Sequence, residues 1–125
     1  MGVAKRMSKE ILVVDDQPGI RLLLQEIFIA EGYSVTTAET GKEALEWLYA
    51  RSFDLVMLDY KLPIVDGSEV LRQLERDQVL VPAIVMSGMG DDIRNELKQY
   101  SIVREVFAKP FNIKEVSRFV KSILD

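Results

Sequence analysis

Five side chains that carry carboxylate, hydroxyl or ammonium groups stand at the ends of short apolar runs. Asp15 and Asp16 follow "ILVV", Asp59 follows "LVML", Ser87 follows "IVM" and Lys109 follows "VFA". Three carboxylates brought close together bind protons more tightly unless a cation lies among them. Carboxylate oxygens suit Mg2+, which takes one or two protein carboxylates, waters and phosphate oxygens as ligands. The set therefore predicts a metal site in which Asp59 is a ligand or a nucleophile towards a phosphoryl group.

Each of these residues also has an ordinary structural interpretation. Asp16 alone would more often cap a helix that begins at Pro18, and Asp59 alone could form a turn, as we expect for Asp66 with Gly67. Lys109 before Pro110 could simply be a solvated loop residue, and so could Ser87 beside Gly88. The combination favours a site, because five unrelated residues would not by chance stand at successive strand ends.

The elements that must position these side chains alternate along the chain. Short runs rich in Val, Ile and Leu predict strands over residues 10–14, 33–37, 54–58, 82–86 and 104–107. Apolar residues at helical spacing predict five helices between and after them. We expect these helices from Pro18 to a stop at Gly32, after a Thr40 cap, around Val70, Leu71 and Leu74, over about 91–99, and after an Asn112 cap.

This alternation predicts a doubly wound α/β fold, with a parallel five-stranded sheet covered by helices on both faces. The runs "ILVV" and "LVML" show no polar alternation, as expected for strands buried on both sides. In such sheets the functional crevice lies beyond the carboxyl ends of the strands. We expect residues 1–8 to be an N-terminal tail and residues 9–125 to form the single domain.

Composition narrows the chemistry. The 125 residues include 16 basic and 20 acidic side chains in no single-sign block, so a nucleic-acid role for the chain by itself is disfavoured. There is no Cys and no His, which excludes thiolate and imidazole chemistry. No apolar run approaches the ~20 residues of a membrane helix. We expect a cytoplasmic protein that works with carboxylates, hydroxyls, amines and the backbone.

Four motifs together resemble the response-regulator receiver domain. They are "ILVVDD", "DLVMLDYKLPIVDG", "IVMSG" and "VFAKPF", in order from Ile11 to Phe111. The stretch "VVDDQPGIR" further resembles stand-alone receivers of sporulation-type phosphorelays. The resemblance implies the strand order 2-1-3-4-5 and a signalling switch that catalyses its own Mg2+-dependent phosphorylation and slow dephosphorylation.

The resemblance also assigns roles at the site. Asp59 would be phosphorylated, and Asp15 and Asp16 would hold Mg2+, for which Mn2+ could substitute. The backbone carbonyl of Tyr60 would complete the protein's ligands, and Lys109 would pair with a phosphoryl oxygen.

The resemblance also implies which residues respond to phosphorylation and which control its lifetime. Ser87 would hydrogen-bond the phosphoryl group, and Phe107 would be the switching aromatic, although an ordinary core aromatic is an equal alternative. Lys61 and Met89 would tune phosphate hydrolysis. The peptide bond before Pro110 is expected to be cis.

Because the chain has no His, its phosphoryl donor must be another protein's phosphohistidine or a small acyl phosphate. A sensor histidine kinase or a histidine phosphotransferase would dock at the first helix, around Gln17, Gly19 and Ile20. The protein would be a monomer or a weak dimer linked to activation, with no membrane partner.

Three alternatives stay open. The chain ends at Asp125 without a linker, which favours a stand-alone receiver over a piece of a DNA-binding regulator or hybrid kinase. An aspartate-nucleophile phosphatase of the haloacid dehalogenase type would need an acid where this chain has Lys61. A binding module with a vestigial acidic rim would not need all five site residues.

Overall fold

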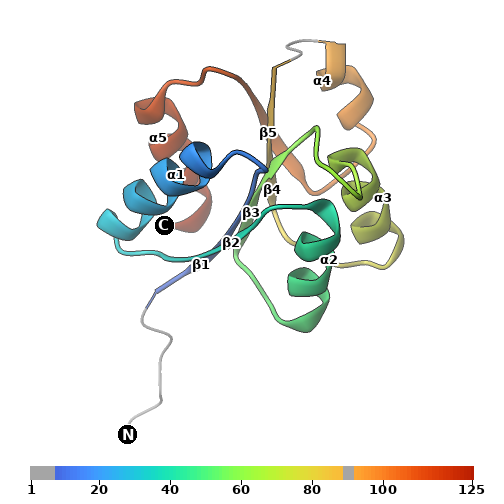
Figure 1. Cartoon of the computed structure of the whole chain (residues 1–125), viewed down its shortest axis with the longest axis horizontal. Helices are drawn as coiled ribbons and strands as arrows, with labels where there is room; N and C mark the ends of the chain where they lie inside the picture. The colour runs from blue at the N-terminus through green and yellow to red at the C-terminus, as the bar shows by residue number, and fades with distance from the viewer. Residues whose placement is uncertain (1–7, 89–91) are drawn as a thin grey trace, which may run out of the picture.

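The computed structural model describes residues 8–88 and 92–125, and in these it has five strands alternating with five helices (Figure 1). The strands are β1 (Glu10–Val14), β2 (Ser34–Ala38), β3 (Leu55–Asp59), β4 (Ala83–Ser87) and β5 (Val103–Ala108). The helices are α1 (Pro18–Ala30), α2 (Gly41–Ala50), α3 (Gly67–Arg76), α4 (Asp92–Leu97) and α5 (Ile113–Leu124).

All strand pairs are parallel, and the sheet order is β2-β1-β3-β4-β5. Figure 1 shows α1 and α5 on one face of the sheet and α2, α3 and α4 on the other. The predicted doubly wound α/β fold and its strand order are therefore confirmed. Within the two described ranges, no helix combines the length and the apolar character that crossing a membrane requires.

The central strands divide their side chains between two cores. In β1, Ile11 and Val13 pack with α1 and α5, whereas Leu12 and Val14 pack with α2, α3 and α4. The same alternation holds in β3 and β4, so both faces of each central strand are apolar, as the sequence predicted. Each fully buried Leu, Ile or Val contributes roughly 1.5–3 kcal/mol, which fixes the strands whose ends carry the site.

Two predicted helix caps are confirmed. The Thr40 hydroxyl accepts a hydrogen bond from the Glu43 amide at 3.0 Å, and the Asn112 side chain accepts one from the Glu115 amide at 3.1 Å. The N-cap position of α1 is Gln17, whose side chain makes no capping bond. Asp16 therefore does not cap α1.

Four of the five strands differ from their predicted boundaries by one residue. β2, β3 and β4 each start and end one position later, and β5 gains a residue at both ends. The ladder continues past the apolar runs, since the Tyr60 amide donates to the Met86 carbonyl at 2.9 Å and the Lys109 amide to the Ser87 carbonyl at 2.8 Å. Asp59 and Ser87 are consequently the last residues of their strands, held by sheet hydrogen bonds.

Candidate functional site

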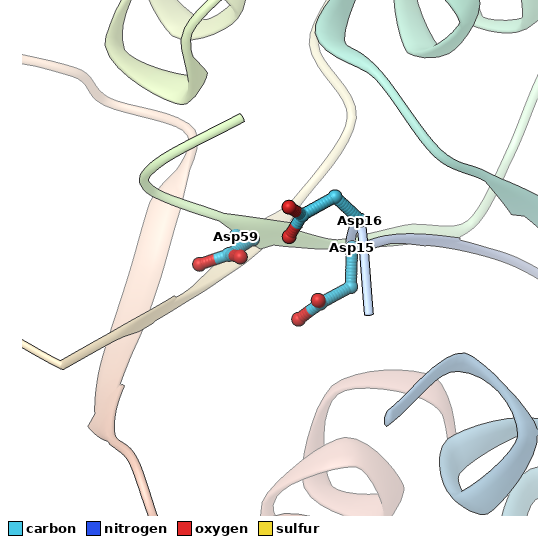
Figure 2. A group of neighbouring side chains, drawn as sticks. All are labelled: Asp15, Asp16 and Asp59. Carbon is cyan, nitrogen blue, oxygen red and sulfur yellow. The ribbon is translucent and has the colours of Figure 1, made fainter. Parts of the chain in front are cut away.

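Three carboxylates meet at the carboxyl ends of β1 and β3. Figure 2 shows Asp15 and Asp16 just beyond β1 and Asp59 at the end of β3. Each offers an oxygen atom that lies within 4.8 Å of those of the other two. Asp15 is fully buried, Asp59 is nearly so, and Asp16 is exposed. The convergence predicted from the sequence is confirmed, and one side of the cluster is open to solvent.

Lys109 supplies a cation from the end of β5. Its Nζ donates to Asp15 Oδ2 at 2.8 Å and to Asp59 Oδ2 at 3.2 Å. The peptide bond between Lys109 and Pro110 is cis, as predicted. One ammonium facing three carboxylates leaves these four groups with a net charge of two negative units when all are ionised.

The electrostatics of the cluster favour a further cation. Burial, together with the charge of Asp15, raises the pKa of Asp59 from 3.8 to about 6, although Lys109 opposes the rise. Burial alone would lower the pKa of Lys109, but its hydrogen bond with Asp15 and the charge of Asp59 raise it. A divalent ion with oxygen ligands would neutralise the excess negative charge, so these residues fit Mg2+.

Asp15 is fixed by contacts that the sequence analysis did not identify. Its Oδ1 accepts a hydrogen bond from the Gln17 amide at 2.9 Å, and its backbone carbonyl accepts one from Arg21 Nη1 at 2.8 Å. The first contact is an Asx turn, which an Asp two residues before the N-cap of a helix could have indicated. The second joins α1 to the site and has no local sequence signal.

A close approach of α3 shapes the turn after Asp59. The Gly67 amide donates to the Tyr60 carbonyl at 3.0 Å, and a Cβ at Gly67 would lie 2.4 Å from the Asp59 carbonyl oxygen. Only glycine therefore permits this approach. Asp66 closes the turn by accepting a hydrogen bond from the Leu62 amide at 3.2 Å, but it is also the N-cap position of α3, and Gly67 is the first residue of that helix and not part of a free turn.

Of the other residues predicted for the site, Tyr60, Lys61 and Ser87 line one pocket with Asp59. A pocket beside Asp59 is lined by Asp16, Gln17, Asp59, Tyr60, Lys61, Ser87, Gly88 and Lys109. Ser87 is buried, and Lys61 is exposed. Phe107 is half-buried in β5, where its ring meets that of Phe119 at 6.0 Å between centroids. Met89 lies outside the described residues.

Tyr60 has a second role that the sequence analysis missed. It is 8% exposed, and its hydroxyl donates to Glu96 Oε2 of α4 at 2.5 Å. This hydrogen bond and burial raise the pKa of Tyr60 to about 12. The residue next to Asp59 is thus tied to a helix 36 positions further along the chain, and only the tertiary structure reveals this.

Comparisons with known proteins agree with this geometry. A family model described as the response regulator receiver domain matches residues 11–121. Sporulation initiation phosphotransferase F of Bacillus subtilis is 40% identical over 119 residues, which cover 94% of this chain and 95% of that protein. The alkaline phosphatase synthesis transcriptional regulatory protein PhoP of Bacillus subtilis is 37% identical over 118 residues, covering 94% of this chain and 49% of that protein.

A solved structure shows the same arrangement of elements. Response regulator protein TrrA from Thermotoga maritima, in complex with Mg2+-BeF, superposes with a TM-score of 0.82 at 37% identity. The match covers 93% of this chain and 99% of that chain.

Proposed function

The chain belongs to the response regulator receiver domain family of two-component and phosphorelay signalling, and we propose that Asp59 accepts a phosphoryl group from a partner's phosphohistidine. The observation that carries this function is the convergence of Asp15, Asp16 and Asp59 with Lys109 at one pocket. Asp59 is the nucleophile, because it stands at the end of a central strand, lines the pocket and accepts a hydrogen bond from Lys109.

Asp15, Asp16 and Asp59 would hold Mg2+, or Mn2+ in its place, since both ions take oxygen ligands. When bound, the ion supplies positive charge against the carboxylates and the phosphoryl oxygens. The predicted backbone ligand, the Tyr60 carbonyl, already accepts a hydrogen bond from Gly67, which leaves it one lone pair. Lys61 also lines the pocket, so its carbonyl would be the alternative backbone ligand on the same turn.

The chemical step is a displacement at phosphorus. An Asp59 carboxylate oxygen forms a bond to phosphorus, the bond from phosphorus to the donor nitrogen breaks, and its electron pair stays with the donor imidazole. With acetyl phosphate as donor, the leaving group is acetate. Lys109 pairs with a phosphoryl oxygen. Its Nζ, which now donates to Asp59 Oδ2, would then donate to the phosphoryl group carried by Asp59.

Ser87 and Phe107 would convert phosphorylation into a change of shape. Ser87 ends β4 and lines the pocket, which supports the proposal that its hydroxyl would hydrogen-bond the phosphoryl group. Phe107 lies on β5 and is half-buried, so we propose that a change of its rotamer accompanies the movement of the Ser87 hydroxyl. The tuning role of Met89 is proposed from the family resemblance alone.

We further propose that the protein passes its phosphoryl group on to a second protein in a phosphorelay. Lys61 is exposed at the pocket, where its long side chain would hinder a water molecule that attacks the acyl phosphate. The phosphoryl group would then persist long enough to be transferred to a second protein. If a Lys61→Ala variant loses phosphate at the wild-type rate, Lys61 does not slow hydrolysis and the support for a relay role is lost.

The partner would be a sensor histidine kinase or a histidine phosphotransferase that docks on α1. The N-cap residue of this helix, Gln17, lines the pocket, and the outer face of the helix exposes Leu22, Leu23 and Ile29 by 56%, 40% and 53%. This apolar face suits an amphipathic helix of the donor. Of the predicted docking residues, Gly19 is exposed at the start of the helix, whereas Ile20 packs partly against the core. A Leu22→Glu variant should lose phosphotransfer from a phosphorylated histidine phosphotransferase far more than phosphorylation by acetyl phosphate.

We propose no nucleic-acid contact for this domain by itself, in line with its net charge of −4. We propose that the protein is a monomer, or a weak dimer formed on activation, and that it carries phosphoryl groups in the cytoplasm. The chain spans about half the length of PhoP, so a receiver within a longer DNA-binding regulator or hybrid kinase is the alternative context.

Mass spectrometry after incubation with acetyl phosphate tests the function. We expect one phosphoryl group per chain, labile in base, which requires Mg2+ and is absent from Asp59→Asn. An aspartate-nucleophile phosphatase would instead release phosphate continuously without accumulating the adduct. A module used only for binding would gain no phosphoryl group, and either result would reject the proposal.

A further inference from the structure

Tyr60 connects the phosphorylation site to three other elements. Its amide donates to Met86 of β4 at 2.9 Å, and its carbonyl accepts from Gly67 of α3 at 3.0 Å. Its buried side chain reaches α4, where the hydroxyl donates to Glu96 at 2.5 Å. Because Tyr60 directly follows Asp59, a change in its position is transmitted to the nucleophile through one peptide unit.

α4 is a short helix whose position depends on tertiary contacts. Ile93 and Leu97 are its buried apolar anchors, and Arg94 donates to Glu105 at 2.8 Å and to the Val106 carbonyl at 2.6 Å. A helix of six residues is not stable alone, so such contacts determine where it lies. The hydrogen bonds of Arg94 lead to β5, whereas that of Glu96 leads to the residue after Asp59.

We infer that Glu96 is a positioning residue for the acidic site, acting through the hydroxyl of Tyr60. It holds the turn after Asp59 in place and couples α4 to metal binding by a path separate from Ser87 and Phe107. This inference rests on the proposed function, because it takes a metal ion to bind beside Asp59. Such coupling is reciprocal. If the hydrogen bond to α4 increases the affinity of the site for the metal ion, binding of the metal ion must stabilise α4 by the same free energy.

Calorimetric titration of the full chain with Mg2+ tests the inference. Tyr60→Phe and Glu96→Ala should each raise the dissociation constant roughly fivefold, at the low end of known coupling between sites. The double variant should bind no more weakly than either single variant, because both remove the same hydrogen bond. Glu96→Gln should bind Mg2+ like the wild type, since its amide oxygen still accepts from Tyr60.

Tyr49 provides a matched control. Its hydroxyl donates to Asp77 at 2.5 Å, the same length as the Tyr60 bond, but at the C-terminal ends of α2 and α3. Tyr49→Phe should therefore leave the Mg2+ dissociation constant unchanged. Hydrogen exchange provides a second measurement: Mg2+ should slow exchange of the amides of residues 93–97 in the wild type, and much less in Tyr60→Phe.

Three results would overturn the inference. They are a dissociation constant within twofold of the wild type in both single variants, a Glu96→Gln variant as weak as Glu96→Ala, and effects that multiply in the double variant. The second would mean that Glu96 acts by its charge alone. A wild-type chain that binds no Mg2+ would instead refute the proposed function, so the two failures are distinguishable.

Discussion

At the scale of single residues, Asp59 is in an unfavourable position for a carboxylate. It is 6% exposed and faces Asp15, and Lys109 compensates only part of this cost. Its pKa of about 6 is above its ordinary value of 3.8. In its ionised form, a carboxylate in this environment destabilises the folded protein unless a bound cation or a covalent modification removes the repulsion. Metal binding and phosphorylation of Asp59, as proposed, would each do so.

The stability of the protein should reflect this pKa. Between about pH 4 and 6 the folded state binds more protons at Asp59 than the unfolded state, so the free energy of unfolding falls as the pH rises. Asp59→Asn removes this titration. Without metal, the free energy of unfolding of the variant should exceed that of the wild type by about 3 kcal/mol above this range and equal it below, as measured by urea unfolding. A difference that does not vary with pH would contradict the assignment.

Ile64 is a strained residue in the loop between β3 and α3. It lies in the loop after β3 with φ of 70°, a left-handed conformation that a β-branched residue adopts only at a cost, and it is 76% exposed. Ile64→Asn should raise the free energy of unfolding by about 1 kcal/mol, because Asn tolerates this conformation. Leu80→Asn is the control: Leu80 is 67% exposed without a positive φ, and its substitution should give no such gain.

At the scale of elements, α1 and α3 end in the same hydrogen-bonding motif with different residues. The Tyr33 amide donates to the Phe28 carbonyl at 3.0 Å after α1, and the Val79 amide donates to the Leu74 carbonyl at 2.9 Å after α3. Both are Schellman motifs, which need a left-handed residue just past the helix. α1 has Gly32 there with φ of 98°, as its predicted stop, whereas α3 has Gln78 with φ of 59°.

This difference predicts opposite effects of two substitutions. Gln78→Gly should stabilise the protein by up to about 1 kcal/mol, because glycine adopts the left-handed conformation freely. Gly32→Ala should destabilise it by about 1 kcal/mol from backbone conformation alone, since a Cβ at Gly32 meets no atom within 4 Å. Thermal unfolding of both variants measures this, and changes of the same sign would refute it.

The sequence was sufficient for the elements but not for all their ends. Buried strands and amphipathic helices leave clear periodic patterns, and the caps at Thr40 and Asn112 are local signals. β3 and β4 end one residue later than predicted, because sheet hydrogen bonds continue past the apolar residues to Asp59 and Ser87. The end of α3 has no glycine, so its left-handed Gln78 could not be recognised from the residue type.

At the scale of the whole molecule, topology explains why the site could be predicted. The carboxyl ends of parallel strands share one edge, so Asp15, Asp59 and Lys109 meet although up to 94 positions separate them. The contacts of Arg21 with Asp15 and of Tyr60 with Glu96 could not be predicted. They depend on how side chains from different elements pack, which no spacing along the chain specifies.

The most direct test of the account is a calorimetric Mg2+ titration of the wild type and of Asp16→Asn, which changes an exposed carboxylate of the acidic cluster without disturbing the core. We predict one Mg2+ per chain, bound more weakly as the pH falls through about 6 and much more weakly in Asp16→Asn. Glu26→Gln, an equal change of charge on the exposed face of α1, should bind like the wild type. No binding, or equal binding by wild type and Asp16→Asn, would contradict the account.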